Sequence, residues 1–151
     1  TLRASVELGV SSVTSLTTDR CVIKKHPAKT KSERWKKIVL ESSKQCGRAK
    51  VPLVADDIES LEEFCRNNDD RDIKLVFWEN ESNNSLKNIK LDQVPCSVAV
   101  LIGPEGGFSL DEINIVREYG FQTVRMGPRI IRAETAPVVV LALLQSSWGD
   151  L

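Results

Sequence analysis

The fold is decided by the stretch Val98-Ala99-Val100-Leu101-Ile102-Gly103-Pro104-Glu105-Gly106-Gly107-Phe108. It opens as an uninterrupted apolar run that Gly-Pro ends, a pattern typical of a strand buried on both faces. A glycine-rich loop with one carboxylate, Glu105, follows the strand. Ser109 and Glu112 then match the capping-box pattern, which predicts that a helix begins there.

A strand, a glycine loop and a helix start in this order predict a crevice for a phosphate or a nucleotide at a sheet edge. Gly103, Gly106 and Gly107 carry no Cβ, so a ligand can approach the backbone closely. The spacing matches neither GxGxxG nor GxxxxGK[ST]. Taken alone, the loop is therefore equally well explained as a tight turn between a strand and a helix.

The composition indicates an ordinary globular domain. A chain of 151 residues is long enough to bury one core. No apolar run approaches about 20 residues, and we expect no transmembrane span and no signal segment. The single histidine, His26, and the scattered cysteines predict no zinc site. We expect buried free thiols in a reducing compartment; the cysteines are Cys21, Cys46, Cys65 and Cys96.

The net charge of zero conceals an uneven distribution along the chain. Residues 1–50 carry 12 basic and 4 acidic side chains, whereas residues 51–100 carry 5 and 11. A basic first third is typical of a face that binds a polyanion. A solvated lysine-rich surface explains the same count slightly better.

Apolar periodicity and breaker residues predict alternating helices and strands. We expect helices over Leu2–Leu8, Ser32–Cys46, a segment capped by Asp57, Leu110–Tyr119 and Ala136–Trp148, and strands over Val10–Leu16, Cys21–Ile23, Val51–Val54, Ile73–Trp78, Val98–Ile102 and Phe121–Met126. Lys24–Lys31 and Asn80–Gln93 are expected to be polar loops. The alternation favours an α/β fold with a mostly parallel sheet and helices on both faces.

A second glycine-containing loop follows a strand near the C-terminus. Leu101–Ser109 and Met126-Gly-Pro-Arg-Ile-Ile-Arg-Ala-Glu-Thr-Ala136 together resemble the RsmE family, the small-subunit ribosomal RNA (uracil-N3) methyltransferases of the SPOUT class. Gln45-Cys46-Gly47-Arg48 and Glu7–Val10 are similar to that family too, so the resemblance covers almost the whole chain. Ala133 and Pro137 depart from the usual pattern.

The resemblance implies a fold, a cofactor and partners. It implies one SPOUT-type, trefoil-knotted methyltransferase domain over residues 1–151, without the family's N-terminal PUA-like RNA-binding domain and without its first strand. It also implies S-adenosylmethionine as cofactor, small-subunit ribosomal RNA as substrate and a homodimer. The compartment would be the cytoplasm, as in bacteria, or a chloroplast or mitochondrion in a eukaryote.

Residues of the two loops are the candidates for the site. The cofactor would lie against Trp78, Glu79, Leu101, Ile102, Gly103, Pro104, Gly106, Gly107, Met126, Gly127, Ile130, Ile131 and Arg132. Arg132 could stabilise the charge on a deprotonated uracil, and Arg129 could pair with a phosphate. Glu105 could accept the N3 proton or hold the cofactor's amino group. Structural ion pairs and helix capping by Glu134 and Thr135 remain the alternatives.

Two rival functions also fit the sequence. One is a related SPOUT enzyme that methylates a ribose 2′-hydroxyl. The other is a non-catalytic, dimeric cofactor-binding module.

Overall fold

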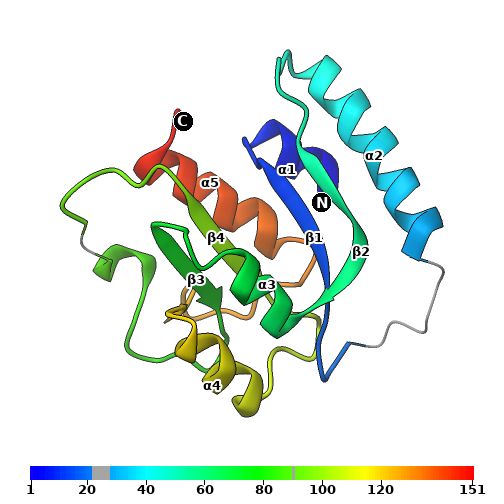
Figure 1. The fold of residues 1–151 in the computed structure, drawn as a ribbon. Coiled ribbons are helices and arrows are strands. Elements are labelled where there is room, and N and C mark those ends of the chain that lie inside the picture. Colours follow the sequence, from blue (N-terminus) through cyan, green and yellow to red (C-terminus); the bar gives the residue numbers. More distant parts are fainter. Residues whose placement is uncertain (22–27, 90) are drawn as a thin grey trace. The chain divides into compact units, whose positions relative to one another are not determined.

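The computed structural model describes residues 1–21, 28–89 and 91–151, in which helices and strands alternate (Figure 1). In chain order the elements are α1 (Leu2–Glu7), β1 (Ser12–Thr17), α2 (Ala28–Gln45), β2 (Leu53–Ser60), α3 (Leu61–Asn67), β3 (Ile73–Phe77), the 3-10 helix η1 (Leu86–Asn88), β4 (Val98–Ile102), α4 (Leu110–Glu118), β5 (Gln122–Val124) and α5 (Ala136–Trp148). The described residues form two compact units. Unit 1 comprises residues 1–16, 28–59 and 137–151, and unit 2 comprises residues 17–21, 60–89 and 91–136.

The sheet of unit 2 has the strand order β4-β3-β5 and is parallel throughout. The central strand β3 pairs Ile73 with Val98 and Phe77 with Ile102 on one side. On its other side Phe77 pairs with Val124. Four of the five β3 residues are buried, as is typical of a strand in a parallel sheet whose two faces are both covered. The expected parallel α/β architecture is confirmed, although β1 and β2 form a separate two-stranded sheet.

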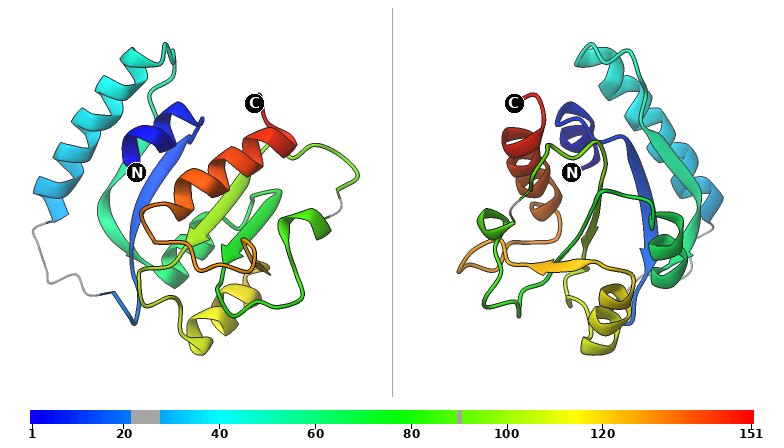
Figure 2. Two further views of the ribbon diagram at one scale, coloured as in Figure 1. Left: turned by 180° about the vertical axis from the view of Figure 1, so that it is seen from behind. Right: turned by 60° about the vertical axis from the view of Figure 1, so that its left-hand side comes forward.

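Two capped helices pack together beside the sheet of unit 2 (Figure 2). α3 contacts α4, and α4 also contacts β5. The rings of Phe64 and Phe121 lie 6.4 Å apart, measured between centroids. Ser109 and Glu112 form the predicted capping box at the start of α4, in which each side chain accepts the other residue's backbone N–H.

In unit 1, Arg48 ties the end of α2 to the end of α1. Its Nη1 donates to the carbonyl of Val6 at 2.8 Å and to the carbonyl of Val10 at 2.7 Å. Carbonyls at a helix C-terminus have no partner within the helix, so an arginine is a suitable donor there. α1 and α2 pack against each other accordingly.

α5 is joined to the same region of unit 1 through Gln145. The Nε2 of Gln145 donates to the carbonyl of Leu8 at 3.0 Å. The next residue, Gly9, has a φ of +86°, and a Cβ there would lie 1.9 Å from that Nε2. Glycine is therefore required twice over, by the left-handed backbone and by the close approach of Gln145.

Three predicted boundaries are wrong. α2 begins at Ala28, not at Ser32, because the preceding Ala-Lys-Thr-Lys segment contains strong helix formers and no breaker. Ser32 is instead buried inside the helix, and its hydroxyl donates to Asp56. β2 continues to Ser60, so the predicted cap Asp57 lies within a strand. The helix that follows, α3, is capped by Ser60, which forms a capping box with Glu63.

The remaining predicted elements differ only in length where the structure describes them. The last predicted strand is shortened to β5, and the polar segment after β3 contains η1. The strand proposed over Cys21–Ile23 falls largely outside the described residues. α5 has the predicted bounds, and no helix within the described ranges is long and apolar enough to cross a membrane.

All four cysteines are free thiols. Cys65, a residue of α3, is fully buried, and this burial raises its pKa to about 11. Cys21 and Cys46 are half-buried and Cys96 is exposed, so the expectation of buried thiols is confirmed only for Cys65. The position of Cys96 just before β4, outside the apolar run, explains that exposure.

Candidate functional site

Three loops begin at one edge of the unit 2 sheet. Phe77 is in register with Ile102 of β4 and with Val124 of β5, so the three parallel strands end side by side. The segments that follow start at Trp78, Gly103 and Arg125. The carboxyl edge of a parallel sheet is where such folds place their ligands. The predicted convergence of the cofactor loops at one edge is therefore present.

The glycine loop is closely packed by side chains of unit 2. Gly107 has a φ of +68°, and a Cβ there would lie 1.9 Å from Oε1 of Glu79. A Cβ on Gly106 would lie 3.0 Å from the Cβ of Arg20. A Cβ on Gly103 would lie 3.2 Å from the ring of Phe108. Each of the three glycines therefore permits close packing within the protein itself, beyond the approach of a ligand predicted from the sequence.

The start of α4 is surrounded by carboxylates. Glu112 accepts hydrogen bonds from the backbone N–H groups of Ser109 and Asp19, both at 2.8 Å. Asp19 in turn accepts from the hydroxyl of Ser109 at 2.7 Å. These negative charges disfavour a phosphate at this helix start. This helix start suits a neutral or cationic ligand better than the anionic one that the strand-loop-helix pattern first indicated.

Sequence reasoning missed Asp19 and Arg20. They precede the glycine loop by more than 80 residues, and no local pattern connects them to it. Arg20 Nη1 donates to the carbonyl of Gly106 at 2.8 Å. Only the folded chain brings these residues to the loop.

Trp78 directly follows β3 and is half-buried. Its backbone N–H donates to the carbonyl of Val124 at 3.0 Å, and the Arg117 guanidinium lies 5.8 Å from the ring centroid. Its Nε1 is buried without a hydrogen-bond partner among the described residues. A buried donor without an acceptor is destabilising by about 1–3 kcal/mol. Trp78 is therefore suited to donate to an acceptor on a bound ligand.

The loop after Trp78 is held in place by Glu81. One carboxylate oxygen accepts from the hydroxyl of Thr123 at 2.6 Å, and the other accepts from the N–H groups of Asn83 and Asn84. Arg117 lies 3.9 Å from the first oxygen. The Thr123 hydroxyl, the two N–H groups and Arg117 hold the pKa of Glu81 below its ordinary value of 4.5. The start of the segment Asn80–Gln93, predicted only as a polar loop, is thus fixed to β5 by the hydrogen bond between Glu81 and Thr123.

Because the folded-state pKa of Glu81 is lowered, its ionised form stabilises the fold above the ordinary carboxyl pKa. This stability is lost as the pH falls through the lowered value. We expect Glu81→Gln to lower the free energy of unfolding at about pH 7 and to differ little from the wild type at about pH 2. Urea denaturation at several pH values measures this difference. Glu118→Gln, on the exposed end of α4, is the control, and a gap independent of pH would contradict the prediction.

The second loop exposes its charged and apolar side chains. Ile130 is 88% exposed, and the side chain of Arg132 is 85% exposed with Nη1 3.8 Å from Oε1 of Glu134. Within the described residues, the side chains of Arg129 and Glu105 have no hydrogen-bond or ion-pair partner. The N–H groups of Thr135 and Ala136 both donate to the carbonyl of Arg132, which makes a turn before α5.

The other candidate residues lie at the same edge with little side-chain exposure. Leu101 is buried in β4, and Met126 and Ile131 are half-buried. Ile102, Gly103 and Pro104 are also half-buried, whereas Gly127 is exposed with a φ of +129°. Leu101 can contribute only backbone groups to a ligand at this edge, whereas Met126 and Ile131 can also contribute the accessible parts of their side chains.

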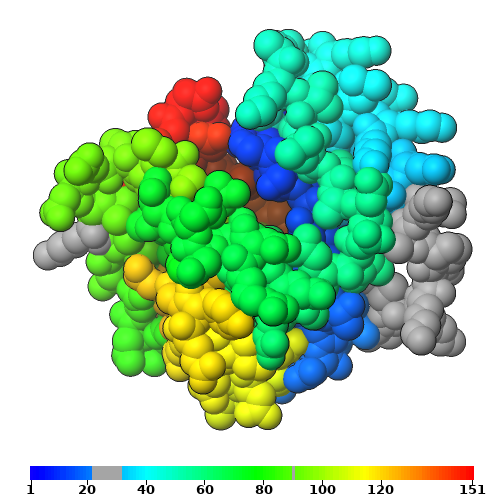
Figure 3. Space-filling view, in the orientation of Figure 1, coloured from blue at the N-terminus to red at the C-terminus, as the bar shows by residue number. Residues whose placement is uncertain are grey.

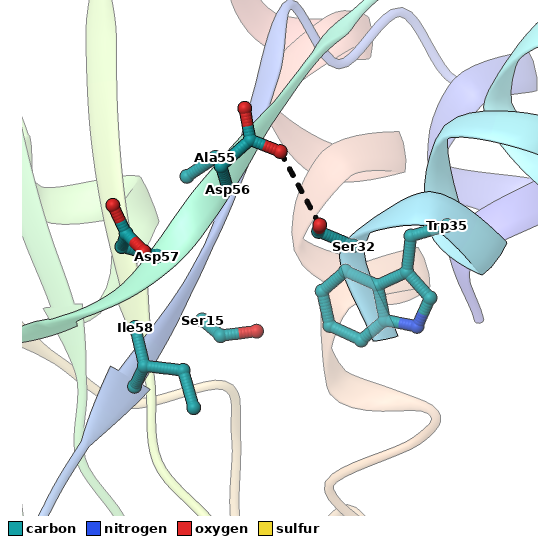
Figure 4. Close-up of a pocket in the computed structure, with 7 residues that line it drawn as sticks. All are labelled: Ser15, Ser32, Trp35, Ala55, Asp56, Asp57 and Ile58. Atoms are coloured by element: carbon teal, nitrogen blue, oxygen red, sulfur yellow. Dashed lines mark hydrogen bonds between the residues drawn. The ribbon is translucent and has the colours of Figure 1, made fainter. Parts of the chain in front are cut away.

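A separate hollow in unit 1 carries no such site. It lies between α2 and the β1-β2 pair and is lined by Ser15, Ser32, Trp35, Ala55, Asp56, Asp57 and Ile58 (Figure 4). The Ser32 hydroxyl donates to Asp56 at 3.2 Å, and Lys36 also pairs with that carboxylate. Its volume of about 10 Å³ holds one water molecule at most. Within the described ranges no group of three metal-binding side chains occurs either.

Comparison with known proteins assigns this arrangement to a class. The family model described as an RNA methyltransferase domain matches residues 1–145. The chain belongs to this family of RNA methyltransferase domains. It is 34% identical to the ribosomal RNA small subunit methyltransferase E of Buchnera aphidicola (subsp. Acyrthosiphon pisum) over 99% of this chain and 58% of that protein. The Synechocystis protein of the same name is 33% identical over 96% of this chain and 48% of that protein.

Solved structures show the same fold. A protein from Legionella pneumophila, solved in complex with the bound cofactor SAM, superimposes with a TM-score of 0.90 at 35% identity, over 99% of this chain and 61% of that one. Ribosomal RNA small subunit methyltransferase E from Neisseria gonorrhoeae, bound to S-adenosyl methionine, has a TM-score of 0.83 at 34% identity, over 99% and 60%. The chain thus spans at most about three fifths of the length of these relatives. The resemblance to the RsmE family is confirmed.

Proposed function

We propose that this chain is the catalytic part of an S-adenosylmethionine-dependent methyltransferase that acts on uracil N3 in small-subunit ribosomal RNA. The observation that carries the proposal is the convergence of the loops after β3, β4 and β5 at one sheet edge. The family membership and the relatives solved with this cofactor support it. The proposal includes the trefoil knot of the SPOUT class, which the likeness in fold supports.

The residues at the sheet edge fit this cofactor. S-adenosylmethionine carries a cationic sulfonium, a cationic amino group and one carboxylate, and supplies an activated methyl group when bound. Glu79 already places a carboxylate beside Gly107, at the point where any other residue would carry a Cβ. Trp78 has a buried Nε1 in need of an acceptor. Glu79 and the backbone of the glycine loop would hold the cofactor's charged groups, and the backbone of Leu101, Met126 and Ile131 would contact the adenine edges.

The exposed residues of the two loops would act on the RNA. Uracil N3 carries a proton that must leave before the nitrogen can attack, and negative charge then spreads to the ring oxygens. Arg132 would stabilise that negative charge as a hydrogen-bond donor held in a fixed position near the ring oxygens. Glu105 would accept the proton or contact the cofactor's amino group, and Arg129 would pair with a backbone phosphate. Their exposure leaves all three accessible to a substrate as large as RNA.

Two measurements test the proposal. Titration calorimetry of this chain with S-adenosylmethionine should show saturable binding. Incubation of the protein that carries this chain with undermethylated small ribosomal subunits should yield 3-methyluridine, detected by mass spectrometry of the digested RNA. A product methylated on a ribose 2′-hydroxyl would overturn the uracil assignment. Binding of the cofactor without methylation of any RNA would favour a non-catalytic module.

We also propose a homodimer in which α5 packs against its symmetry mate. Ala136, Val140 and Leu144 form the buried stripe of α5, whereas Leu143 is 42% exposed although the helix is apolar nearly all round. An apolar residue on the exposed side of such a helix is suited to an interface. The expected partner is therefore a second copy of this chain.

Leu143→Glu should convert this dimer to a monomer, because the charge would be buried without a partner in the interface. Light scattering at micromolar concentration measures the mass directly. Leu53→Glu, on the exposed edge of β2, is the control and should leave the mass unchanged. A monomeric wild type would refute the dimer.

A further inference from the structure

We infer that Arg20 is a positioning residue for the glycine loop, and that it sets the affinity of the loop for the cofactor. The inference rests on the proposed function in naming S-adenosylmethionine as the ligand. Its structural part, that Arg20 restrains the loop, stands on the contacts within unit 2. Arg20 belongs to a short segment, residues 17–21, that lies against the start of α4 (Figure 3).

Arg20 contacts the glycine loop at Gly106 through one hydrogen bond and one packing contact. Its Nη1 donates to the carbonyl of Gly106 at 2.8 Å. Its Cβ covers Gly106 so closely that a methyl group there would lie 3.0 Å away. The hydrogen bond fixes the direction of the peptide group between Gly106 and Gly107. The neighbouring N–H of Gly107, which closes a turn onto the carbonyl of Pro104 at 2.9 Å, belongs to that same peptide group.

The segment that carries Arg20 is itself anchored next to the loop. The Asp19 N–H donates to Glu112, and the Asp19 carboxylate accepts from the Ser109 hydroxyl. Both contacts involve the capping box that terminates the loop at α4. Arg20 therefore reaches Gly106 from a support that is bonded to the far end of the same loop. A loop restrained at both ends loses less conformational freedom when a ligand binds.

Arg20 uses few of its five donors in this contact, and the side chain is exposed. A phosphate contact with RNA is therefore a different function for the same side chain. The two functions separate experimentally, because positioning acts on the cofactor in the absence of RNA. A phosphate contact would change only RNA binding and its salt dependence.

The test compares Arg20→Met, which keeps the aliphatic packing over Gly106, with Arg20→Lys, which keeps a donor. Amide exchange by NMR in the ligand-free protein is the first measurement. Arg20→Met should speed exchange of the Gly107 amide by about tenfold, since loss of a charged hydrogen bond loosens the turn. Arg20→Lys should restore most of the protection. Arg66→Met, on the exposed side of α3, should match the wild type.

Calorimetry with S-adenosylmethionine is the second measurement. We expect Arg20→Met to weaken binding by about tenfold and Arg20→Lys by about threefold or less. Gly106→Ala should weaken binding too, because its methyl group displaces Arg20, and its effect should not add to that of Arg20→Met.

The possible outcomes distinguish the proposed binding of S-adenosylmethionine from the restraint of the glycine loop by Arg20. A wild type that fails to bind S-adenosylmethionine refutes the proposed function, while Gly107 exchange still decides whether Arg20 restrains the loop. If Arg20→Met leaves both exchange and cofactor affinity unchanged, the inference is wrong. If that variant raises only the KM for RNA, Arg20 is a phosphate contact and the inference is overturned as well.

Discussion

Replacement of Arg132 with alanine should lower the rate of RNA methylation by about a thousandfold, while the affinity for S-adenosylmethionine stays within about threefold. The guanidinium is 85% exposed and only loosely paired with Glu134, so its removal should leave the fold intact. Its charge is needed where negative charge develops on the uracil ring, which is after the cofactor has bound. The loss should therefore fall on kcat.

The assay uses small ribosomal subunits and the protein that carries this chain, with single-turnover methyl transfer as the readout. Arg71→Ala, an exposed arginine near the N-terminal edge of the sheet, is the control and should retain wild-type turnover. Glu134→Ala distinguishes the two interpretations of Arg132. If it lowers turnover as severely as Arg132→Ala, the ion pair is what matters. Near-normal turnover by Arg132→Ala would make that residue structural.

Gly107→Ala should weaken cofactor binding by at least about tenfold, the second large effect that the structure predicts. The φ of +68° costs an alanine about 1 kcal/mol, and the new Cβ would occupy the position of Oε1 of Glu79. Glu79 must then move away from the loop. The change removes both the left-handed turn and the carboxylate beside it.

Gly120→Ala is a closely matched control for this change. Gly120 has a φ of +80° at the end of α4, and a Cβ there would meet only the end of the Lys74 side chain at 3.3 Å. Both variants should lose similar free energy of unfolding in urea. Only Gly107→Ala should lose affinity in calorimetry. Equal binding by the two variants would remove Gly107 and Glu79 from the site.

Much of the fold followed from patterns that are local in the sequence. The apolar runs predicted β3 and β4, the Ser109-Glu112 pair predicted the start of α4, and the last apolar segment predicted the bounds of α5. These signals depend on residues within one turn or one strand of each other, so no tertiary information is needed. The prediction failed at Ser32 because the helix begins earlier, at Ala28, and it failed at Asp57 because β2 continues to Ser60, which caps α3 instead.

The candidate site also combines features that the sequence predicted with features that only the structure shows. The two loops and Trp78-Glu79 were recognised from the sequence, because their residues follow strands that must end at one edge of a parallel sheet. The sequence could not show that Arg20 and Asp19 support the glycine loop, or that Glu81 anchors the segment after β3 to Thr123. It also could not show that carboxylates crowd the start of α4, where its pattern indicated a phosphate.

The sequence by itself determined most of the helices and strands, though not where α2 begins or where β2 gives way to α3; it also determined which loops carry glycines and to which family the chain is similar. The tertiary structure decided what lies beside each glycine: Arg20 at Gly106 and Glu79 at Gly107. The reason is physical. Propensity, periodicity and capping act between near neighbours along the chain, whereas hydrogen bonds and charges at a site act between neighbours in space. Arg20 and Gly106 became neighbours only when the chain folded.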